Sequence, residues 1–335
     1  MNFIVNEQLI SIREKCRNLK PLVVIHCLTY NHELYLRDAL EGFVMQKTNF
    51  PFVAIVHEDA STDKTADILR EYAEKYPDII LPIFEKENQY SKGDGSLSKI
   101  YNFALDASGA KYVAICEGDD YWIDPNKLQK QVDFLESHPN YGMVYGISKQ
   151  YVQKDKKFIN NRGNEYKNIN ELIILPYNIP TATLLFNKNI KDEAYKKYIG
   201  EKKWKMGDYP LSLAIASHSK IKFIPEEMSV YRIIATSACH FNNYEKEKDF
   251  YLSSYNLKLY FAKIHGISID NNMKNLFYLG LYNIALKYNH SKESYKIAKK
   301  LKKKGIKKII FKIINLNYFT YLFYYNLIKY KINQC

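Results

Sequence analysis

Short apolar runs alternate with longer amphipathic segments between Pro21 and about Tyr145. The runs have the length and composition of buried strands, which are predicted at residues 22–28, 52–59, 78–85 and 111–120. The segments between them carry apolar residues at helical spacing, and helices are predicted at residues 33–46, 63–76, 96–108 and 126–138. This alternation is typical of an α/β fold in which helices cover both faces of a parallel sheet.

The pattern is less regular after about residue 150. It predicts in turn a helix followed by a strand, a helix, a strand or hairpin, and a mostly helical region, at residues 167–188, 210–219, 220–233 and 246–335. Polar clusters follow the first, second and fourth predicted strands. Because ligands of parallel α/β sheets collect beyond the carboxyl ends of the strands, we expect the functional site at that edge.

Composition indicates a folded protein of one large or two medium domains, since 47% of its 335 residues are hydrophobic. The first twenty residues carry charges throughout, unlike a signal peptide, and no run approaches the roughly 20 uncharged apolar residues of a membrane span. The five cysteines are scattered, without a Cys-x-x-Cys pair. We therefore expect a reduced, cytoplasmic protein without a structural zinc site.

Much of the net charge of +13 lies near the C-terminus. Lysines beside large apolar residues suit a helix that attaches residues 296–335 to an anionic membrane surface. A terminal helix packed on the core, with its lysines in solvent, explains the same pattern. A nucleic-acid-binding protein would gather basic and aromatic residues around one groove. The clusters at the strand ends are instead acidic, so nucleic acid is not expected as a partner.

The most acidic of these clusters is the segment "EGDD", in which Glu117, Asp119 and Asp120 follow an apolar run directly. Carboxylates this close repel one another, and a divalent cation among them would remove that repulsion. Hard oxygen ligands suit Mg²⁺ or Mn²⁺, which commonly bridge to substrate phosphates. The alternative is a solvated acidic turn that caps the following helix.

Two further clusters follow predicted strands. Asp59 comes directly after the second strand and could bind a ribose or base edge, whereas residues 61–63 are explained as turn and helix-capping residues. Residues 29–31 follow the first strand and could contact a base. His26 and His57 lie inside apolar strands and are interpreted as core residues.

Four segments in this order, "LTYNHELYLRDAL", "EDASTDKT", "CEGDDYW" and "GDYPLSL", resemble the motifs of family 2 glycosyltransferases. The resemblance covers roughly residues 20 to 240 and is nearest to bacterial members that build surface polysaccharides. It implies a GT-A fold, a Rossmann-like nucleotide-sugar-binding sheet flanked by helices. It also implies an inverting transfer from a nucleotide-diphosphate sugar.

The resemblance implies a nucleotide pocket lined by residues from three of the motifs. They are Thr29, Tyr30, Asn31, Glu33, Asp59, Glu117, Gly118 and Asp119. Asp59 would bind the base, usually uracil. Glu117 stands where an aspartate is usual, which leaves its role less defined.

The resemblance also implies a divalent cation, Mn²⁺ or Mg²⁺, held by Asp119 with Asp120 adjacent. The cation would neutralise the diphosphate leaving group as its charge develops. Some relatives carry a metal-binding histidine directly after Tyr-Arg-x, where this chain has Ile234. His240, six residues further on, is a candidate for that role, with a structural histidine as the alternative. Arg232 suits either a phosphate contact or an ion pair.

Displacement at an anomeric carbon needs a base for the proton of the acceptor hydroxyl. The segment "WKMGDYPLSL" resembles the one that supplies this base, which makes Asp208 the candidate. Because Asp208 precedes Tyr209 and Pro210, it also suits the N-terminus of a helix, and the two roles are compatible.

These inferences give an N-terminal helical segment over residues 1–20, a GT-A domain over 21–240 and a basic helical region over 241–335. Within the domain, a nucleotide-binding half covers about 21–145 and an acceptor half about 146–240. The expected function is transfer of a sugar, from a donor that is UDP-linked, to a hydroxyl of a glycan or lipid-linked acceptor. The protein would work in the cytoplasm or on the inner face of the plasma membrane.

Three alternatives belong to other classes. The isoleucine at position 234 keeps open a catalytically inactive protein that binds sugar nucleotides. The high pI keeps open a nucleic-acid-binding protein. A nucleotidyltransferase would share the metal and nucleotide chemistry, but it needs a glycine-rich phosphate loop near the first strand, which "CLTYNHE" does not provide.

Overall fold

The computed structural model describes residues 3–234, 241 and 243–300, and side chains from residue 7 onward. Position 240 and nearly all of the basic segment 296–335 lie outside the described residues. The chain divides into two compact units. Unit 1 contains the described residues of Met1–Ile169, Tyr177–Glu201 and Leu211–Ala235, and unit 2 those of Asn170–Pro176, Lys202–Pro210 and Thr236–Cys335.

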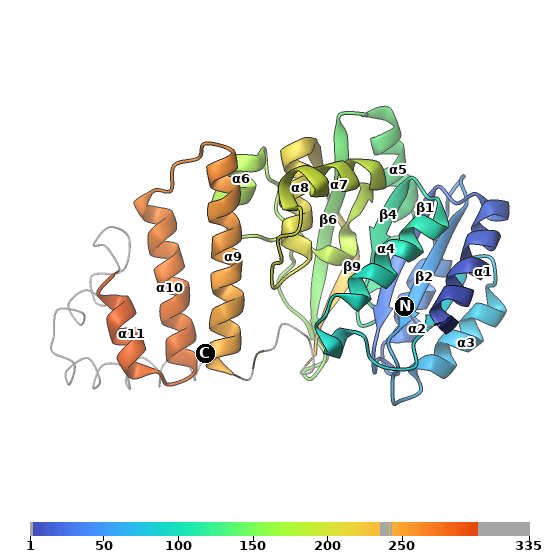
Figure 1. Ribbon diagram of the computed structural model, residues 1–335, viewed down its shortest axis with the longest axis horizontal. Helices are drawn as coiled ribbons and strands as arrows, with labels where there is room; N and C mark the ends of the chain where they lie inside the picture. The colour runs from blue at the N-terminus through green and yellow to red at the C-terminus, as the bar shows by residue number, and fades with distance from the viewer. Residues whose placement is uncertain (1–2, 235–240, 242, 301–335) are drawn as a thin grey trace. The chain divides into compact units, whose positions relative to one another are not determined.

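Unit 1 is built on a mixed sheet (Figure 1). Its described strands are β1 (Val23–Thr29), β2 (Phe52–Glu58), β3 (Ile80–Phe84), β4 (Tyr112–Ile115), β5 (Tyr121–Trp122), β6 (Tyr141–Val152), β7 (Lys157–Phe158), β8 (Leu185–Asn187) and β9 (Lys220–Ile233). They lie in the order β3-β2-β1-β4-β8-β6-β9-β5, and β7 pairs with β6. The sheet is parallel from β3 to β4, as predicted.

Beyond β4 the sheet departs from the predicted parallel pattern. β8 runs antiparallel to both β4 and β6, β9 runs parallel to β6, and β5 runs antiparallel to β9. The long strand β6 was not predicted, because glycines and polar residues interrupt the apolar run of "YGMVYGISKQYV". The predicted α/β class is correct. The sequence pattern did not reveal the mixed parallel and antiparallel pairing of the strands beyond β4.

Helices flank this sheet on the chain segments between its strands. The helices that begin or lie in unit 1 are α1 (Phe3–Leu19), α2 (Leu36–Val44), α3 (Thr65–Lys75), α4 (Ser96–Ser108), α5 (Lys127–Ser137), α6 (Ile169–Ile174) and α7 (Lys188–Ala194). α1 packs beside α4 and against β3, and α3 packs against β2 and β3 (Figure 1). β1 and β2 are buried along almost their whole length, as expected for central parallel strands covered on both faces.

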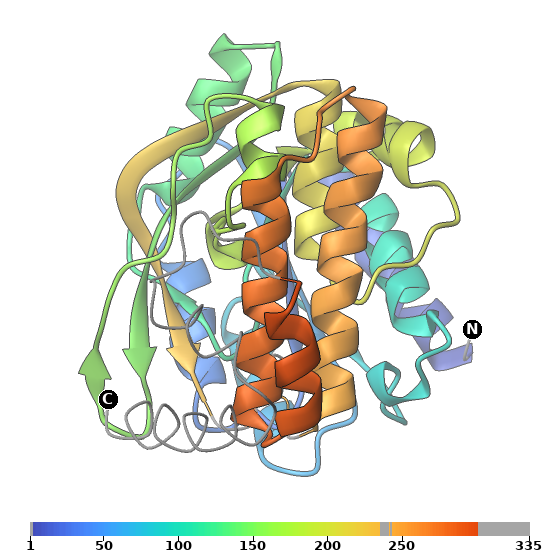
Figure 2. The same cartoon turned by 90° about the vertical axis from the view of Figure 1, so that its left-hand side faces the viewer.

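Unit 2 is mainly helical and contains α9 (Tyr244–Ile264), α10 (Asn271–Lys287) and α11 (Ser291–Ala298). α10 packs against both α9 and α11 (Figures 1 and 2). Asn243 and Asp270 cap α9 and α10, since their side chains accept hydrogen bonds from backbone N–H groups of the first turn. No helix in the described part of the chain is both long and apolar enough to cross a bilayer.

The helix α8 (Asp208–His218) begins with three residues of unit 2 and continues in unit 1. It confirms the helix predicted at residues 210–219. Most other predicted strands and helices are present within a few residues of the expected ends, but β4 already ends at Ile115. The segment predicted as a strand or hairpin at residues 220–233 is the single strand β9, and the region predicted to be mostly helical after residue 246 is helical within the described residues.

One close contact fixes α2 against the strand β5. A β-carbon placed on Gly42 would lie 2.9 Å from the backbone nitrogen of Trp122 and 3.2 Å from its carbonyl oxygen. Because backbone atoms cannot turn aside as a side chain can, this helix position accepts only glycine without movement of the strand.

We expect Gly42→Ala to lower the free energy of unfolding by roughly 1–3 kcal/mol, because the added methyl forces α2 away from Trp122. Urea denaturation measures this change. Gly207→Ala is the control, since its methyl group would meet nothing within 4 Å and should change stability by less than about 0.5 kcal/mol. Equal urea midpoints for Gly42→Ala and the wild type would contradict a close contact between Gly42 and the backbone of Trp122.

Candidate active site

The polar segments that follow β1, β2 and β4 come together at one edge of the sheet. The parallel register continues past the strand ends, since the N–H of Asp59 donates to the carbonyl of Thr29 at 3.0 Å. The N–H of Gly118 likewise donates to the carbonyl of Leu28 at 2.9 Å. The three clusters that the sequence analysis singled out therefore surround the carboxyl end of β1.

The loops after β1 and β2 are tied to each other by side chains. Asn31 accepts a hydrogen bond from the N–H of Thr62 at 2.8 Å, and Glu33 accepts one from the N–H of Lys64 at 3.0 Å. In return, the N–H of Glu33 donates to the carboxylate of Asp63 at 3.1 Å. Asn31 and Glu33 thus hold the start of α3, a role that the sequence analysis did not assign to them.

Asp59 is fully buried, and both of its carboxylate oxygens are engaged. They accept the backbone N–H groups of Gln89 at 2.7 Å and Tyr90 at 3.0 Å. Asp59 therefore fixes the loop that follows β3. Tyr30, which follows β1, and Tyr90, which belongs to this network, are both exposed large aromatic residues.

The acidic turn after β4 holds its three carboxylates in different ways. The side chain of Glu117 accepts a hydrogen bond from the N–H of Leu28 at 3.3 Å. Asp120 is buried and accepts the N–H of Arg232 at 2.9 Å. Burial, and then the charge of Asp119, raise the pKa of Asp120 well above its usual value. The half-buried carboxylate of Asp119 makes no hydrogen bond or ion pair with any residue that the structure describes.

Arg232 fastens this turn to β9. Its guanidinium donates to the carbonyl of Asp119 at 3.0 Å, forms an ion pair with Asp38, and lies over the rings of Tyr121 and Tyr35 at 4.5 and 5.3 Å. Arg232 is 5% exposed. Of the two roles considered from the sequence, the ion pair is the one that the structure contains.

A buried lysine lies against β5, the strand that follows this turn. Trp122 donates its indole N–H to the carbonyl of Ala182 at 2.7 Å, and the ammonium group of Lys127 lies 4.0 Å from the centre of its ring. Lys127 is fully buried and donates to Gln131 at 2.9 Å. Burial lowers the pKa of Lys127 to about 7, against its ordinary value of 10.5.

His32 was missed by the sequence analysis, although it stands inside the segment "TYNHE" between two residues that were chosen. Its backbone N–H donates to the hydroxyl of Thr65 at 2.8 Å, and its ring is half-buried. Nδ1 of the ring is buried without a hydrogen-bond partner. Burial lowers the pKa of His32, while the charges of Asp119 and Asp63 oppose the shift.

A divalent cation fits this turn through a single carboxylate. Asp119 offers an unengaged hard-oxygen ligand, whereas the oxygen of Asp120 that faces Arg232 is already used. The described residues contain no group of three histidine, cysteine, aspartate or glutamate side chains arranged for a metal. Ile234 is buried and apolar, and the candidate His240 lies outside the described residues. Substrate oxygens would have to complete the coordination.

Asp208 is the first residue of α8 and belongs to unit 2. Its carboxylate is half-buried and accepts the N–H of Tyr209 at 2.8 Å, as expected at the N-terminus of a helix. The hydroxyl of Tyr209 donates to the carbonyl of Leu172 at 2.9 Å, which anchors the start of α8 within unit 2. The helix-terminal role considered from the sequence is therefore present, and a role as base stays a prediction.

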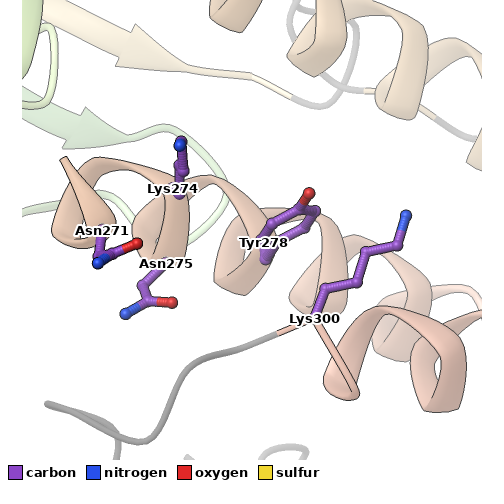
Figure 3. A pocket seen from close by; sticks show the side chains of 5 residues that line it. All are labelled: Asn271, Lys274, Asn275, Tyr278 and Lys300. Carbon is purple, nitrogen blue, oxygen red and sulfur yellow. The ribbon is translucent and has the colours of Figure 1, made fainter. Parts of the chain in front are cut away.

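Unit 2 also contains a cavity of about 420 Å³ on the face of α10 (Figure 3). Its lining residues are Asn271, Lys274, Asn275, Tyr278 and Lys300. The ammonium group of Lys300 lies 5.6 Å from the centre of the Tyr278 ring. The cavity has no acidic lining residue, so it differs in chemistry from the acidic edge of the sheet in unit 1.

Comparison with known proteins gives a consistent result. The family model described as "Glycosyl transferase family 2" matches residues 24–192, which include the segments after β1, β2 and β4. An uncharacterized protein of Mycobacterium bovis is 32% identical over 216 residues, or 64% of this chain and 59% of that protein. The putative teichuronic acid biosynthesis glycosyltransferase TuaG of Bacillus subtilis is 33% identical over 118 residues, 35% of this chain and 43% of TuaG.

Among solved structures, residues 1–349 of S. aureus TarS in complex with UDP-GlcNAc superpose with a TM-score of 0.53. The two sequences are 16% identical, and the match covers 82% of this chain and 79% of the other. This likeness confirms the fold. The matches to the first curated relatives span about three-fifths of the length of those proteins.

The buried Lys127 predicts a pH-dependent stability. Its folded pKa of about 7 lies below that of the unfolded chain, so the unfolded chain binds more protons here between about pH 7 and pH 10. The stability of the wild type should therefore rise with pH relative to Lys127→Met, by up to about 1.4 kcal/mol per pH unit. Urea denaturation across this range measures the difference.

The matched control for this series is Lys99→Met, which removes an exposed lysine of α4 in the same unit. Its stability difference from the wild type should stay constant over the same range. A constant difference for Lys127→Met as well would mean that Lys127 keeps its charge in the folded protein, contrary to the prediction.

Proposed function

Because the chain belongs to glycosyl transferase family 2, we propose that it is an inverting glycosyltransferase whose donor is a UDP-sugar. The acceptor would be a hydroxyl of a glycan or lipid-linked molecule in the synthesis of a bacterial surface polysaccharide. The observation that carries this proposal is the acidic turn, where Asp119 alone keeps an unengaged carboxylate beside the engaged Glu117 and Asp120. Such a carboxylate is available for a cation and its diphosphate.

The names of the relatives support the substrate class. TuaG is described as acting in teichuronic acid biosynthesis, and the Bacillus subtilis protein GgaB in minor teichoic acid biosynthesis. The solved structure of TarS holds UDP-GlcNAc. A uridine diphosphate donor and a cell-surface polymer as product are the corresponding proposals for this chain.

In this proposal the donor nucleotide lies at the carboxyl end of β1. Thr29 is the last residue of β1 and Tyr30 follows it directly, and the exposed ring of Tyr30 offers a surface on which a base can stack. Asn31 and Glu33 act by fixing the loop, as their hydrogen bonds to Thr62 and Lys64 indicate.

Two further residues would shape this donor pocket. Asp59 places the loop after β3 through Gln89 and Tyr90, and thereby one wall of the pocket. Gly118 lets the turn after β4 approach Thr29 and His32, since a β-carbon there would lie 2.7 Å from Oγ1 of Thr29 and 2.9 Å from Nδ1 of His32.

Asp119 would hold a Mn²⁺ or Mg²⁺ ion at the diphosphate. When bound, the cation supplies positive charge that stabilises the leaving group. Arg232 contributes by position: it holds the carbonyl of Asp119 and the side chain of Asp38, so the turn keeps its shape while Asp119 faces its ligand. Asp120 has the same supporting role through the N–H of Arg232.

Asp208 would act as the general base. Its carboxylate takes the proton of the acceptor hydroxyl while that oxygen forms a bond to the anomeric carbon from the face opposite the diphosphate. The bond from the anomeric carbon to the diphosphate oxygen breaks, and its electron pair leaves with the diphosphate. The hydrogen bond from the N–H of Tyr209 orients the carboxylate at the start of α8.

The second candidate is a protein that binds sugar nucleotides without transferring the sugar. Its support is Ile234, a buried apolar residue where some family members carry a metal-binding histidine. The two candidates differ in turnover: an active enzyme releases UDP from a UDP-sugar slowly even with water as the acceptor, and an inactive binding protein does not.

Calorimetric titration of UDP, with and without Mn²⁺, tests the donor site. We expect binding that depends on Mn²⁺ and weakens at least tenfold in Asp119→Asn, because the cation loses its only charged ligand of the turn. Asp67→Asn, which changes an exposed aspartate of α3, should bind like the wild type. Asp120→Asn should mainly lower stability. If UDP binding were lost in Asp120→Asn and kept in Asp119→Asn, Asp120 would be the cation ligand and Asp119 the supporting residue.

Release of UDP from UDP-GlcNAc and other UDP-sugars tests the base. We expect Asp208→Asn to lower kcat by a factor of about 10² to 10⁴ while UDP affinity stays within about twofold, because the amide cannot accept the proton. Asp249→Asn, which removes an exposed partner of Lys205 in the same unit, is the control and should keep wild-type turnover. Unchanged turnover in Asp208→Asn would mean that another residue is the general base.

A further inference from the structure

Two buried polar atoms without partners meet at Gly118. A β-carbon placed on this glycine would lie 2.7 Å from Oγ1 of Thr29 and 2.9 Å from Nδ1 of His32. Neither atom has a hydrogen-bond partner, and Thr29 is 0% exposed. Thr29 ends β1 and His32 follows shortly after it, and the glycine that their side chains approach directly precedes Asp119.

Leaving such groups unpaired is unfavourable, by roughly 1–3 kcal/mol for each buried donor or acceptor. Hydrogen bonds fix the backbone at His32. Its N–H is bound to Thr65, and its carbonyl accepts the N–H groups of Tyr35 and Leu36 at 2.9 and 2.8 Å. A buried polar atom without a partner calls for an explanation, and a bound ion is one of them.

The charges around the imidazole decide which ligand suits it. Asp119 and Asp63 place negative charge near the ring, and Arg232 is the positive group near it. Both terminal nitrogens of the Arg232 guanidinium are used, by Asp38 and by the carbonyl of Asp119, and Nε is buried without a partner. A bare diphosphate would be repelled by the two carboxylates, whereas a cation would be attracted. An imidazole nitrogen and a carboxylate oxygen together suit Mn²⁺.

This inference rests on the proposed donor site. We propose that His32 is a second protein ligand of the divalent cation, beside Asp119. Gly118 has no side chain, so the imidazole can approach the turn that carries Asp119. The hydroxyl of Thr29, at the same point, is then placed to bind a water or phosphate oxygen of the cation's coordination sphere. His32 thereby supplies the nitrogen that Ile234 cannot offer.

The direct test is pulsed electron paramagnetic resonance on the full chain with Mn²⁺ and UDP. A coordinated imidazole gives a ¹⁴N modulation of the Mn²⁺ echo, which we expect in the wild type and not in His32→Gln. His138→Gln, which changes an exposed histidine of unit 1, should keep the modulation. The same modulation in His32→Gln would overturn the proposal.

Calorimetry with UDP gives an independent readout. We expect His32→Gln and His32→Asn to weaken UDP binding about tenfold with Mn²⁺ present and to leave it unchanged without Mn²⁺. Equal weakening in both conditions would assign His32 to the phosphate itself, and unchanged affinity would make it a packing residue; either result overturns metal ligation. Thermal unfolding of both variants checks that each is folded.

Failure of the proposed function looks different from failure of this inference. If the wild type binds no UDP with either Mn²⁺ or Mg²⁺, the donor site is wrong and the role of His32 falls with it. If the wild type binds UDP with Mn²⁺ and the His32 variants bind equally well, the donor site stands and only the ligand assignment is wrong.

Discussion

The hydrogen bond from the N–H of Arg232 to the buried carboxylate of Asp120 is the interaction on which the site depends. It joins the turn after β4 to β9, which is 112 residues further along the chain. A buried carboxyl group needs a hydrogen-bond partner, and β9 supplies one to Asp120 through this N–H. With Asp120 and Glu117 engaged, Asp119 is the carboxylate of the turn that stays available.

Much of the parallel half of unit 1 could be predicted from the sequence, because buried parallel strands are nearly continuous apolar runs. β1 and β2 are of this kind. β6 could not be found in this way, since half-exposed strands between other strands are stabilised by partners that lie far away in the chain. Its neighbours β8 and β9 are separated from it by tens of residues, and no local pattern reveals that pairing.

The candidate site shows the same division between local and distant causes. The order of the polar segments placed them at one sheet edge, and the structure brings them together there. Which of two adjacent aspartates is engaged depends on Arg232, and the engagement of Asp59 depends on Gln89 and Tyr90, so neither could be inferred from spacing. His32 differs: it stood within a chosen motif, and only the unpaired state of its ring nitrogen distinguishes it from its neighbours.

The reciprocal bonds between the loops after β1 and β2 have a consequence for recombination between relatives. Asn31 and Glu33 hold N–H groups of the second loop, while Asp63 and Ser61 accept N–H groups of the first. Each loop therefore supplies hydrogen-bond acceptors for backbone N–H groups of the other loop. A chimera that exchanges one loop alone would leave unpaired groups in both, whereas a crossover outside residues 29–65 transfers the pair intact. Exchanging the two loops together keeps these hydrogen bonds, although a complete helix and strand separate the loops in the chain.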